Sequence, residues 1–312
     1  MNYISLDHGN GGKMTDELID NIFLKYLNNN ILNEKDDSSL LAEIKGKPVI
    51  STDSFVVNPV FFAGGDIGKL AICGTVNDLI MSGANPLYIT AGFIIEEGFP
   101  ISELEKIIKS MADMAAKANV KVVAGDTKVV EKGKCDKIYI NTTGLGNIKN
   151  DNLFTGENIK KGDKLIINGT IGEHGLTILK ERKEMNFNDS LKSDCCLLSS
   201  FVKKIINQNA GIKFMRDPSR GGIATVLNEI SDKFEVSINI KEENIPVRDE
   251  VKSLCKILGL DYLYLANEGK VLMVTAEKDS QKILNIMKSH KYGKNASIIG
   301  SITGIEKSEV LL

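Results

Sequence analysis

The sequence predicts an α/β (α+β) protein built from two domains, and three observations support this. The chain has 312 residues, which suits two domains of ordinary size or one large domain. Patterns typical of helices and of strands alternate along its whole length. A polar stretch rich in Asn, Gly and Lys, residues 147–163, interrupts these patterns before they resume. We therefore expect an N-terminal domain over residues 1–150 and a C-terminal domain over residues 160–312.

The N-terminal half contains the most distinct predicted helix, over residues 102–118. Ser102 and Glu105 have the spacing of a capping box, in which each side chain binds a backbone N–H of the first turn. After this helix we expect a buried strand over 120–124, a loop over 125–128 and another strand over 137–143. The apolar residues of the helix recur at the spacing of one face, and they are Leu104, Ile107, Ile108, Met111 and Ala115.

The C-terminal half repeats the alternation of strands and helices. Asp194 has the position of an N-cap for the second helix of this half. The predicted elements are a strand over 164–168, helices from about 176 and over about 195–208, a strand over 212–215, a loop over 216–222, a helix over 223–234, and β segments at 270–277 and 296–304.

Composition and charge favour an ordinary globular protein. The chain has 39 basic and 41 acidic residues, and this formal charge of −2 argues against a broad surface for nucleic acid or an anionic membrane. The N-terminus lacks the features of a signal peptide, and no run of about 18 apolar residues exists to span a membrane. Five cysteines, with no CxxC spacing, indicate reduced thiols rather than a disulfide scaffold or zinc site. We expect a cytoplasmic protein.

Hydrolase motifs receive little support from the sequence. The three histidines are dispersed, and neither HExxH nor GxSxG spacing occurs. The glycine-rich segment DHGNGGKM at 7–14 is more informative, because successive backbone N–H groups at Gly9, Gly11 and Gly12 can cradle a phosphate. It matches neither the P-loop nor the GxGxxG pattern. A flexible turn is therefore the plain alternative.

Four aspartates are candidates for metal binding. Asp53 follows the apolar run VIST and Asp126 follows VVA, while Asp37 lies in DDSSL. Asp78 lies inside an apolar helical segment, where an unpaired carboxylate would be costly. Carboxylates that converge from separate elements suit Mg²⁺ and a nucleoside triphosphate, because hard cations take oxygen ligands. Taken singly, each is more often a helix cap or a surface charge.

Two further segments of the C-terminal half carry candidate residues. In RDPSRGG, residues 216–222, Arg220 stands before a predicted helix, where backbone N–H groups favour anions. An ordinary loop with Asp217 as a cap is the alternative. In LANEGK, residues 265–270, Glu268 lies between two apolar β segments and is expected at a strand end or turn. It either contacts solvent or faces a cleft.

The order of these motifs is more specific than any one of them. They are HGNGG (8–12), STDSFVVNPVFFAGGDIGKLAICGTVNDLIMSGANPLY (51–88), AGFIIEEGFP (91–100), VAGDTKVV (123–130), RDPSRGGIATVLNEI (216–230) and LYLANEGK (263–270). Over nearly the whole chain they resemble the HypE family of hydrogenase maturation factors, in the superfamily of aminoimidazole ribonucleotide synthetase, selenophosphate synthetase and thiamine-monophosphate kinase. The resemblance implies a two-domain PurM-like fold. The N-terminal domain would complete a β-barrel across a homodimer, and the C-terminal domain would hold a mixed sheet with helices.

The resemblance also implies roles for individual residues. ATP and Mg²⁺ are the implied cofactors, and Lys128 and Glu268 match the residues expected to transfer protons, although Lys128 could instead bind phosphate. The implied nucleotide-binding residues are Gly9, Gly11, Gly12, Thr127, Asp217 and Arg220. The implied metal-binding acids are Asp53, Asp78, Asp126 and, in preference to Asp36, Asp37.

The reaction implied by the resemblance is the ATP-dependent dehydration of a carbamoylated C-terminal cysteine to a thiocyanate, which supplies cyanide for the iron of nickel–iron hydrogenase. The implied partners are the carbamoyltransferase and iron-scaffold maturation proteins. None of the five cysteines matches the terminal cysteine of the family, and the sequence given ends in SEVLL. We therefore expect no self-modification without that tail. Two alternatives stay open: another ATP-dependent enzyme of the superfamily acting on a small molecule, and a tail-less maturation scaffold.

Overall fold

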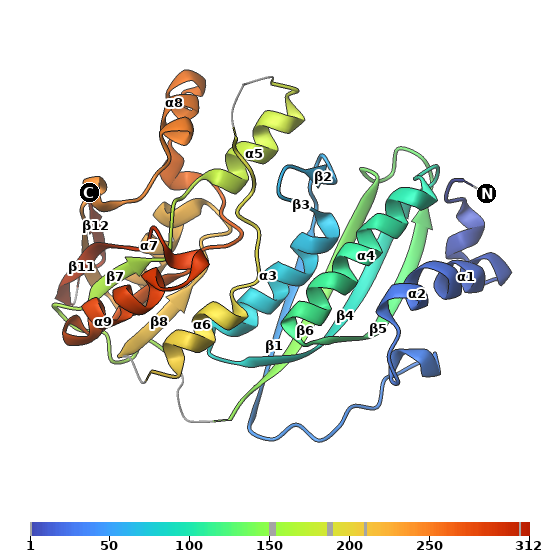
Figure 1. The fold of residues 1–312 in the computed structure, drawn as a ribbon, viewed down its shortest axis with the longest axis horizontal. Coiled ribbons are helices and arrows are strands. Elements are labelled where there is room, and N and C mark those ends of the chain that lie inside the picture. Colours follow the sequence, from blue (N-terminus) through green and yellow to red (C-terminus); the bar gives the residue numbers. More distant parts are fainter. Residues whose placement is uncertain (1, 150–153, 186–189, 209–210, 306) are drawn as a thin grey trace. The chain divides into compact units, whose positions relative to one another are not determined.

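The computed structural model describes residues 2–149, 154–185, 190–208, 211–305 and 307–312, and it confirms the α/β architecture (Figure 1). The chain divides into two compact units. The first contains Met1–Leu79 and Ala84–Asp151, and the second contains Ile80–Gly83 and Asn152–Leu312. Within the described ranges, no helix is both long and apolar enough to cross a membrane.

The first unit is built on a four-stranded sheet covered on one face by two helices. The strand order is β1-β6-β4-β5, with β1 at Lys47–Phe55, β6 at Ile138–Ile148, β4 at Asn85–Glu96 and β5 at Lys121–Val130. Only the β4–β5 pair is parallel, and the crossover between these strands is α4 (Ile101–Ala118). Helices α3 (Ile67–Met81) and α4 lie side by side on the covered face (Figure 1).

The opposite face of this sheet is open. Side chains alternate between the two faces of a strand, and Thr142 on β6 is fully buried under α3, where its Oγ1 contacts Ala71 O at 3.3 Å. Residues on the other face are exposed or half-buried, and they include large apolar side chains such as Ile50 (71% exposed) and Ile94 (43%). An apolar sheet face without a covering layer from its own unit is unusual for a finished fold.

The N-terminal segment packs beside α4 at the β5 edge (Figure 1). It contains short helical turns: η1 (Leu6–Gly9), α1 (Lys13–Leu18), the π-helical turn η2 (Ile19–Phe23), α2 (Leu24–Leu27) and η3 (Leu32–Glu34). The Tyr26 hydroxyl and Lys25 Nζ both donate to Glu105 on α4, at 2.8 and 2.5 Å, and Asn29 Nδ2 donates to Val122 O at 2.8 Å. Two short strands, β2 (Phe61–Phe62) and β3 (Gly65–Asp66), complete this unit.

Three sequence-based expectations in this unit are wrong in detail. The capping box is not formed, because α4 begins at Ile101 after Pro100, and the Glu105 carboxylate binds Tyr26 and Lys25 instead. The loop expected at 125–128 is part of β5, because pairing with β4 continues to Val130. Asp53 likewise lies inside β1 rather than after it. The helix predicted over 102–118 is confirmed.

The second unit is built on a mixed six-stranded sheet, in the order β12-β9-β11-β7-β10-β8. Its strands are β7 (Lys164–Ile167), β8 (Ile212–Arg216), β9 (Val236–Ile240), β10 (Leu272–Thr275), β11 (Ser297–Ile305) and β12 (Glu309–Leu311), and only β12 pairs in parallel. Helix α7 (Gly222–Phe234) packs its apolar face, including Ile223 and Leu227, on one side of the sheet. Helix α9 (Glu277–Lys288) contacts β7 and β11 and packs with α6 (Ser199–Ile206).

The helix expected from about residue 195 is wrong at its start. Helix α6 begins at Ser199 after Leu198, so Asp194 does not cap it. The Asp194 carboxylate instead accepts hydrogen bonds from residues 268–270. The other helices here are α5 (Glu173–Arg182) and α8 (Asp249–Leu258), with turns η4 (Glu242–Asn244), η5 (Tyr262–Tyr264) and η6 (Lys291–Gly293). The predicted strands β7, β8, β10 and β11 are confirmed.

Candidate functional site

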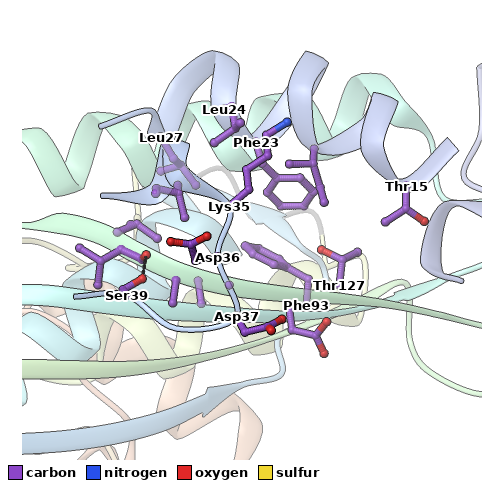
Figure 2. Close-up of a pocket in the computed structure, with 18 of the residues that line it drawn as sticks. Thr15, Phe23, Leu24, Leu27, Lys35, Asp36, Asp37, Ser39, Phe93 and Thr127 are labelled. Atoms are coloured by element: carbon purple, nitrogen blue, oxygen red, sulfur yellow. Dashed lines mark hydrogen bonds between the residues drawn. The ribbon is translucent and has the colours of Figure 1, made fainter. Parts of the chain in front are cut away.

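A pocket of about 380 Å³ lies in the first unit, between the N-terminal segment and the sheet. This volume is within the usual range for small-molecule sites. Figure 2 shows Phe23, Leu24 and Leu27 reaching from the helical turns toward Phe93 on the sheet. The rings of Phe23 and Phe93 lie 4.9 Å apart between centroids, and both side chains are buried. The inner part of the pocket is therefore apolar and aromatic.

The glycine-rich segment forms one end of this pocket through Gly9 and Gly11. Gly9 lies against β5 so closely that an added Cβ would meet Val129 N at 2.4 Å, and Gly11 has a φ of +83°, which favours glycine. Gly12 does not line the pocket but is the N-cap residue of α1. The N–H of Gly11 donates to Thr15 Oγ1 and that of Gly12 to Asn10 Oδ1, each at 3.0 Å. Local side chains thus occupy two of the N–H groups that a phosphate would use, those of Gly11 and Gly12.

The rim of the pocket carries predicted metal and proton-transfer residues. Asp37, Asp126, Thr127 and Lys128 all line it. Lys128 Nζ lies 3.2 Å from Asp126 Oδ1, and both side chains are about two thirds exposed, at 65% and 69%. Thr127 pairs with Phe93 across β4 and β5 and so shares the helix-covered face. The structure therefore gathers six predicted residues around one pocket, and these are Gly9, Gly11, Asp37, Asp126, Thr127 and Lys128.

Asp53 and Asp78 do not line this pocket. Asp53 lies on the sheet face that α3 covers, and Asp78 belongs to α3 itself. Asp53 pairs with the buried Thr142, and an added Cβ at Gly74 of α3 would lie 3.9 Å from Asp53 Oδ2. Asp78, one turn further along α3, accepts a hydrogen bond from Ser51 Oγ at 2.8 Å. Among the described residues, no three His, Cys, Asp or Glu side chains are arranged to hold a metal ion. The assignment of all four aspartates to metal binding stays a prediction.

Glu268 lies in a turn of the second unit, directly before β10. Asp194 holds this turn: its Oδ1 accepts from Glu268 N at 3.1 Å, and its Oδ2 accepts from Gly269 N at 3.2 Å and Lys270 Nζ at 2.7 Å. Lys270 Nζ also lies 3.5 Å from Glu173 Oε2. The side chains of Asp194, Lys270 and Glu173 are 5%, 8% and 11% exposed.

Burial and charge set the protonation of this group. Burial disfavours the charged form of Asp194, but the Lys270 ammonium and the hydrogen bonds from Lys270 and the Glu268 N–H together hold the pKa of the carboxyl below its ordinary range. Burial likewise opposes the Lys270 ammonium, yet Asp194 and Glu173 together raise the pKa of Lys270. For Glu173, burial prevails over Lys270 and raises the pKa of that carboxyl. The network therefore keeps Asp194 and Lys270 as an ion pair.

The turn at 216–222 lies beside the Glu268 turn. Asn267 N and Nδ2 donate to Pro218 O at 3.1 and 3.3 Å, so the two turns are bonded to each other. Gly222 approaches η5 so closely that an added Cβ would meet Leu263 O at 2.3 Å. The structure thus brings the segment of Asp217 and Arg220 next to that of Glu268.

Several residues of these sites were missed by reasoning from the sequence. The apolar lining, Phe23 and Leu27, follows the glycine segment in a short helical stretch whose periodicity could have indicated it. Asp194 and Glu173 act on a turn about 75 to 95 residues further along the chain, and no local pattern signals such contacts.

Comparison with known proteins gives consistent results over the whole chain. AIR synthase related protein, N-terminal domain, matches residues 35–148, and AIR synthase related protein, C-terminal domain, matches residues 160–312. Carbamoyl dehydratase HypE of Cupriavidus necator is 43% identical over 300 residues, covering 96% of this chain and 86% of that protein. The Escherichia coli protein of the same name is 40% identical over 318 residues, covering 100% and 94%.

Solved structures agree with these relatives. A structure of hydrogenase maturation protein HypE in complex with ATP has a TM-score of 0.93 and 43% identity, covering 96% of this chain and 89% of that one. Thiamine monophosphate kinase from Aquifex aeolicus has a TM-score of 0.65 at 18% identity, covering 87% and 89%, and shows the fold alone. The predicted two-domain PurM-like fold is confirmed.

Proposed function

Because the chain belongs to the HypE family of carbamoyl dehydratases, among the AIR synthase related proteins, we propose that it dehydrates a carbamoylated cysteine to a thiocyanate at the expense of ATP. This product would supply the cyanide bound to iron during maturation of nickel–iron hydrogenase. The observation that carries the proposal is the pocket that combines the glycine segment, Asp37, Asp126 and Lys128 with an aromatic inner wall.

The two parts of the pocket suit the two parts of a nucleotide. The inner wall, with Phe23 and Phe93, offers apolar surface for a planar base. The rim offers backbone N–H groups and the Lys128 ammonium for phosphates. A relative of known structure binds ATP. Binding of the phosphates at the glycine segment would require the Gly11 and Gly12 N–H groups to leave Thr15 and Asn10.

Mg²⁺ fits the carboxylates at the rim. This ion commonly takes one or two protein carboxylates and completes its coordination with phosphate oxygens and water. Asp37 and Asp126 would supply those carboxylates, since both line the pocket. When bound, the ion would neutralise charge on the transferred phosphoryl group.

The chemistry of the dehydration follows from the poor leaving ability of an amide oxygen. The thiocarboxamide oxygen attacks the γ-phosphorus of ATP, ADP leaves, and one N–H proton is lost. The phosphorylated intermediate then loses phosphate, carrying the former amide oxygen, and the second N–H proton, which leaves a C≡N group on sulfur. Two N–H protons must therefore be accepted in the course of the reaction. We assign Glu268 and Lys128 to these transfers, with phosphate binding as the alternative role of Lys128.

The partners follow from the same reaction. A carbamoyltransferase must supply the thiocarboxamide, and an iron scaffold must receive the cyanide. A solved structure of a HypE–HypF complex, 48% identical to this chain with a TM-score of 0.81, supports a contact with the HypF maturation protein. The iron-scaffold partner and the cytoplasmic location stay predictions.

The proposal is tested with a synthetic peptide that ends in S-carbamoylcysteine, so the test does not depend on a cysteine of the chain itself. We expect Mg-ATP binding by calorimetry, and loss of one water from the peptide with release of ADP and phosphate. Asp126→Asn should weaken Mg-ATP binding on the order of tenfold or more, because a charge-assisted contact is lost. Asp113→Asn is the matched control, since Asp113 also pairs with an exposed lysine, Lys109, at 2.9 Å.

Two outcomes would contradict this function. ATP turnover with thiamine monophosphate or another small acceptor, and none with the peptide, would favour a different enzyme of the superfamily. A chain that binds no Mg-ATP would favour the maturation scaffold without chemistry.

A further inference from the structure

We propose that Asp194 is a positioning residue for the dehydration: it fixes the turn at residues 267–270 and thereby the place of the Glu268 carboxylate. The inference rests on the proposed function of Glu268 as a proton acceptor. Asp194 itself makes no contact with the reacting atoms in this proposal. It acts only through the backbone of the turn.

The geometry of the carboxylate supports this role. Both of its oxygens are used, one by Glu268 N at 3.1 Å and the other by Gly269 N at 3.2 Å and Lys270 Nζ at 2.7 Å. Two consecutive peptide N–H groups are thus bound to one side chain. Such charge-assisted bonds are stronger than bonds between neutral groups. The peptide bonds on both sides of the Glu268 Cα are therefore held in orientation.

Close packing leaves the turn little room to adopt another path. An added Cβ at Gly269 would lie 2.0 Å from Asp194 O and 2.8 Å from Cys196 Sγ. The backbone of the Asp194 segment therefore touches the turn directly, as well as through the carboxylate. A shift of the Asp194 segment would be transmitted to Glu268.

The other end of the turn is fixed by asparagines. Asn168, directly after β7, donates to Gly269 O at 3.2 Å and accepts from Val271 N at 2.8 Å. The Asn267 carboxamide oxygen accepts from Gly172 N at 2.8 Å. None of these bonds involves the Glu268 carboxylate. Glu268 is half-buried, whereas Asn267, Gly269 and Lys270 are buried. The arrangement holds the backbone on both sides of Glu268.

A purely structural role is the alternative, and the chain offers a matched control for it. Asp163 is also buried, also binds a buried lysine (Lys213 Nζ at 2.6 Å), and also accepts from a backbone N–H (Lys160 N at 2.7 Å). Asp163 precedes β7, whereas Asn168 and the Glu268 turn lie at the other end of that strand. Loss of either aspartate removes a comparable ion pair, but only Asp194 touches the turn.

The test compares Asp194→Asn with Asp163→Asn in the peptide dehydration assay. We expect Asp194→Asn to lower kcat on the order of 100-fold, because a small displacement of a reacting group costs that much, with KM for ATP and for the peptide unchanged. Asp163→Asn should lower the melting temperature while leaving kcat unchanged. In a Glu268→Gln background, Asp194→Asn should add little further loss, since two residues that act through one group are not additive.

Hydrogen exchange supplies a readout that does not depend on catalysis. The amides of Glu268 and Gly269 should exchange faster in Asp194→Asn than in the wild type, and should be unchanged in Asp163→Asn. In Asp163→Asn the Lys160 amide should exchange faster instead. If Asp194→Asn does not fold, Asp194→Glu keeps the charge and displaces it by one methylene, and the same loss of kcat is expected.

Equal kcat in Asp194→Asn and Asp163→Asn, or a full additional loss on top of Glu268→Gln, would overturn the inference. Unchanged exchange of the Glu268 and Gly269 amides would also overturn it. A wild-type chain that dehydrates no peptide would overturn the proposed function instead, and the exchange experiment would still decide whether Asp194 holds the turn.

Discussion

The ligands that a side chain of the first unit can bind depend on the face of the sheet on which the side chain lies. Asp126 and Lys128 are two residues apart on β5 and share the open face, whereas Asp53 on β1 points to the face covered by α3. These are the two edge strands of a four-stranded sheet. With strands about 4.8 Å apart, three strand spacings, or roughly 14 Å along the sheet, separate the backbones of these two strands. A shared role of Asp53 and Asp126 in metal binding therefore stays a prediction.

The position of Lys128 leads to a prediction that separates its two proposed roles. If Lys128 accepts a proton, Lys128→Ala should retain Mg-ATP affinity and lose peptide dehydration. Calorimetry and the dehydration assay measure the two quantities on the same sample. Lys109→Ala is the control, because Lys109 is also exposed and also paired with an aspartate. A fall in ATP affinity in Lys128→Ala alone would assign the lysine to phosphate binding.

Helices and strands were predicted correctly from the sequence where a local pattern of residues defines them. They were missed where contacts with distant residues define them. Helix α4 and the strands β10 and β11 were predicted because a long periodic or β-branched run defines them. The extension of β5 through Gly125 was missed, since Gly-Asp is typical of turns and only pairing with β4 makes it a strand. Asp194 looked like a helix cap because its binding partners lie more than 70 residues away.

Helix α5 begins with two buried titratable residues, and this makes its stability depend on pH. His174 Nδ1 lies 2.8 Å from Ser193 Oγ in a buried position. Burial lowers the pKa of His174 below its ordinary value of 6.5, although Asp194 opposes the shift. Below pH 6.5 the unfolded chain therefore binds a proton that the folded chain does not, and the free energy of unfolding falls as the pH is lowered.

His174→Gln should reduce this loss of stability on acidification. Thermal unfolding measured between about pH 8 and pH 5, the range in which histidine titrates, provides the test. A residual loss is expected in the variant, because burial together with Lys204 and Lys291 also lowers the pKa of His290. Glu173 acts in the opposite sense at lower pH, since burial raises its pKa. An identical pH dependence in wild type and variant would contradict the prediction.

At the scale of the whole molecule, the open face of the first unit indicates self-association. Ile50 and Ile94 lie on a sheet face that no helix covers in the described part of the unit, and exposed apolar faces of this kind mark interaction sites. The family resemblance implies a barrel formed with a second copy of the chain. The alternation of apolar and polar residues in one sequence does not indicate such a partner, because in the expected barrel the completing layer would come from another molecule.

We accordingly predict a homodimer in solution that a charge on the open face converts to a monomer. Ile94→Lys should shift the mass measured by light scattering from dimer to monomer, because an unpaired ammonium would be buried in the interface. Ile257→Lys on α8 is the control, since Ile257 is also exposed (69%) but belongs to the second unit. A wild-type monomer, or a dimeric Ile94→Lys, would refute this interface.

The contacts of the turn before β10 also explain why the sequence motif ANEGK, residues 266–270, is specific. Asn267 binds the neighbouring turn, and Lys270 neutralises the Asp194 carboxylate. At position 269 only glycine is small enough to pass Asp194 O. The identities of Asn267, Gly269 and Lys270 thus follow from these contacts, and we assign the acidic side chain of Glu268 to the proposed proton transfer. We therefore expect remote relatives that share this turn to carry an acidic residue at the position of Asp194. A relative that differs only at Glu268 is expected to keep the turn and to catalyse a different reaction.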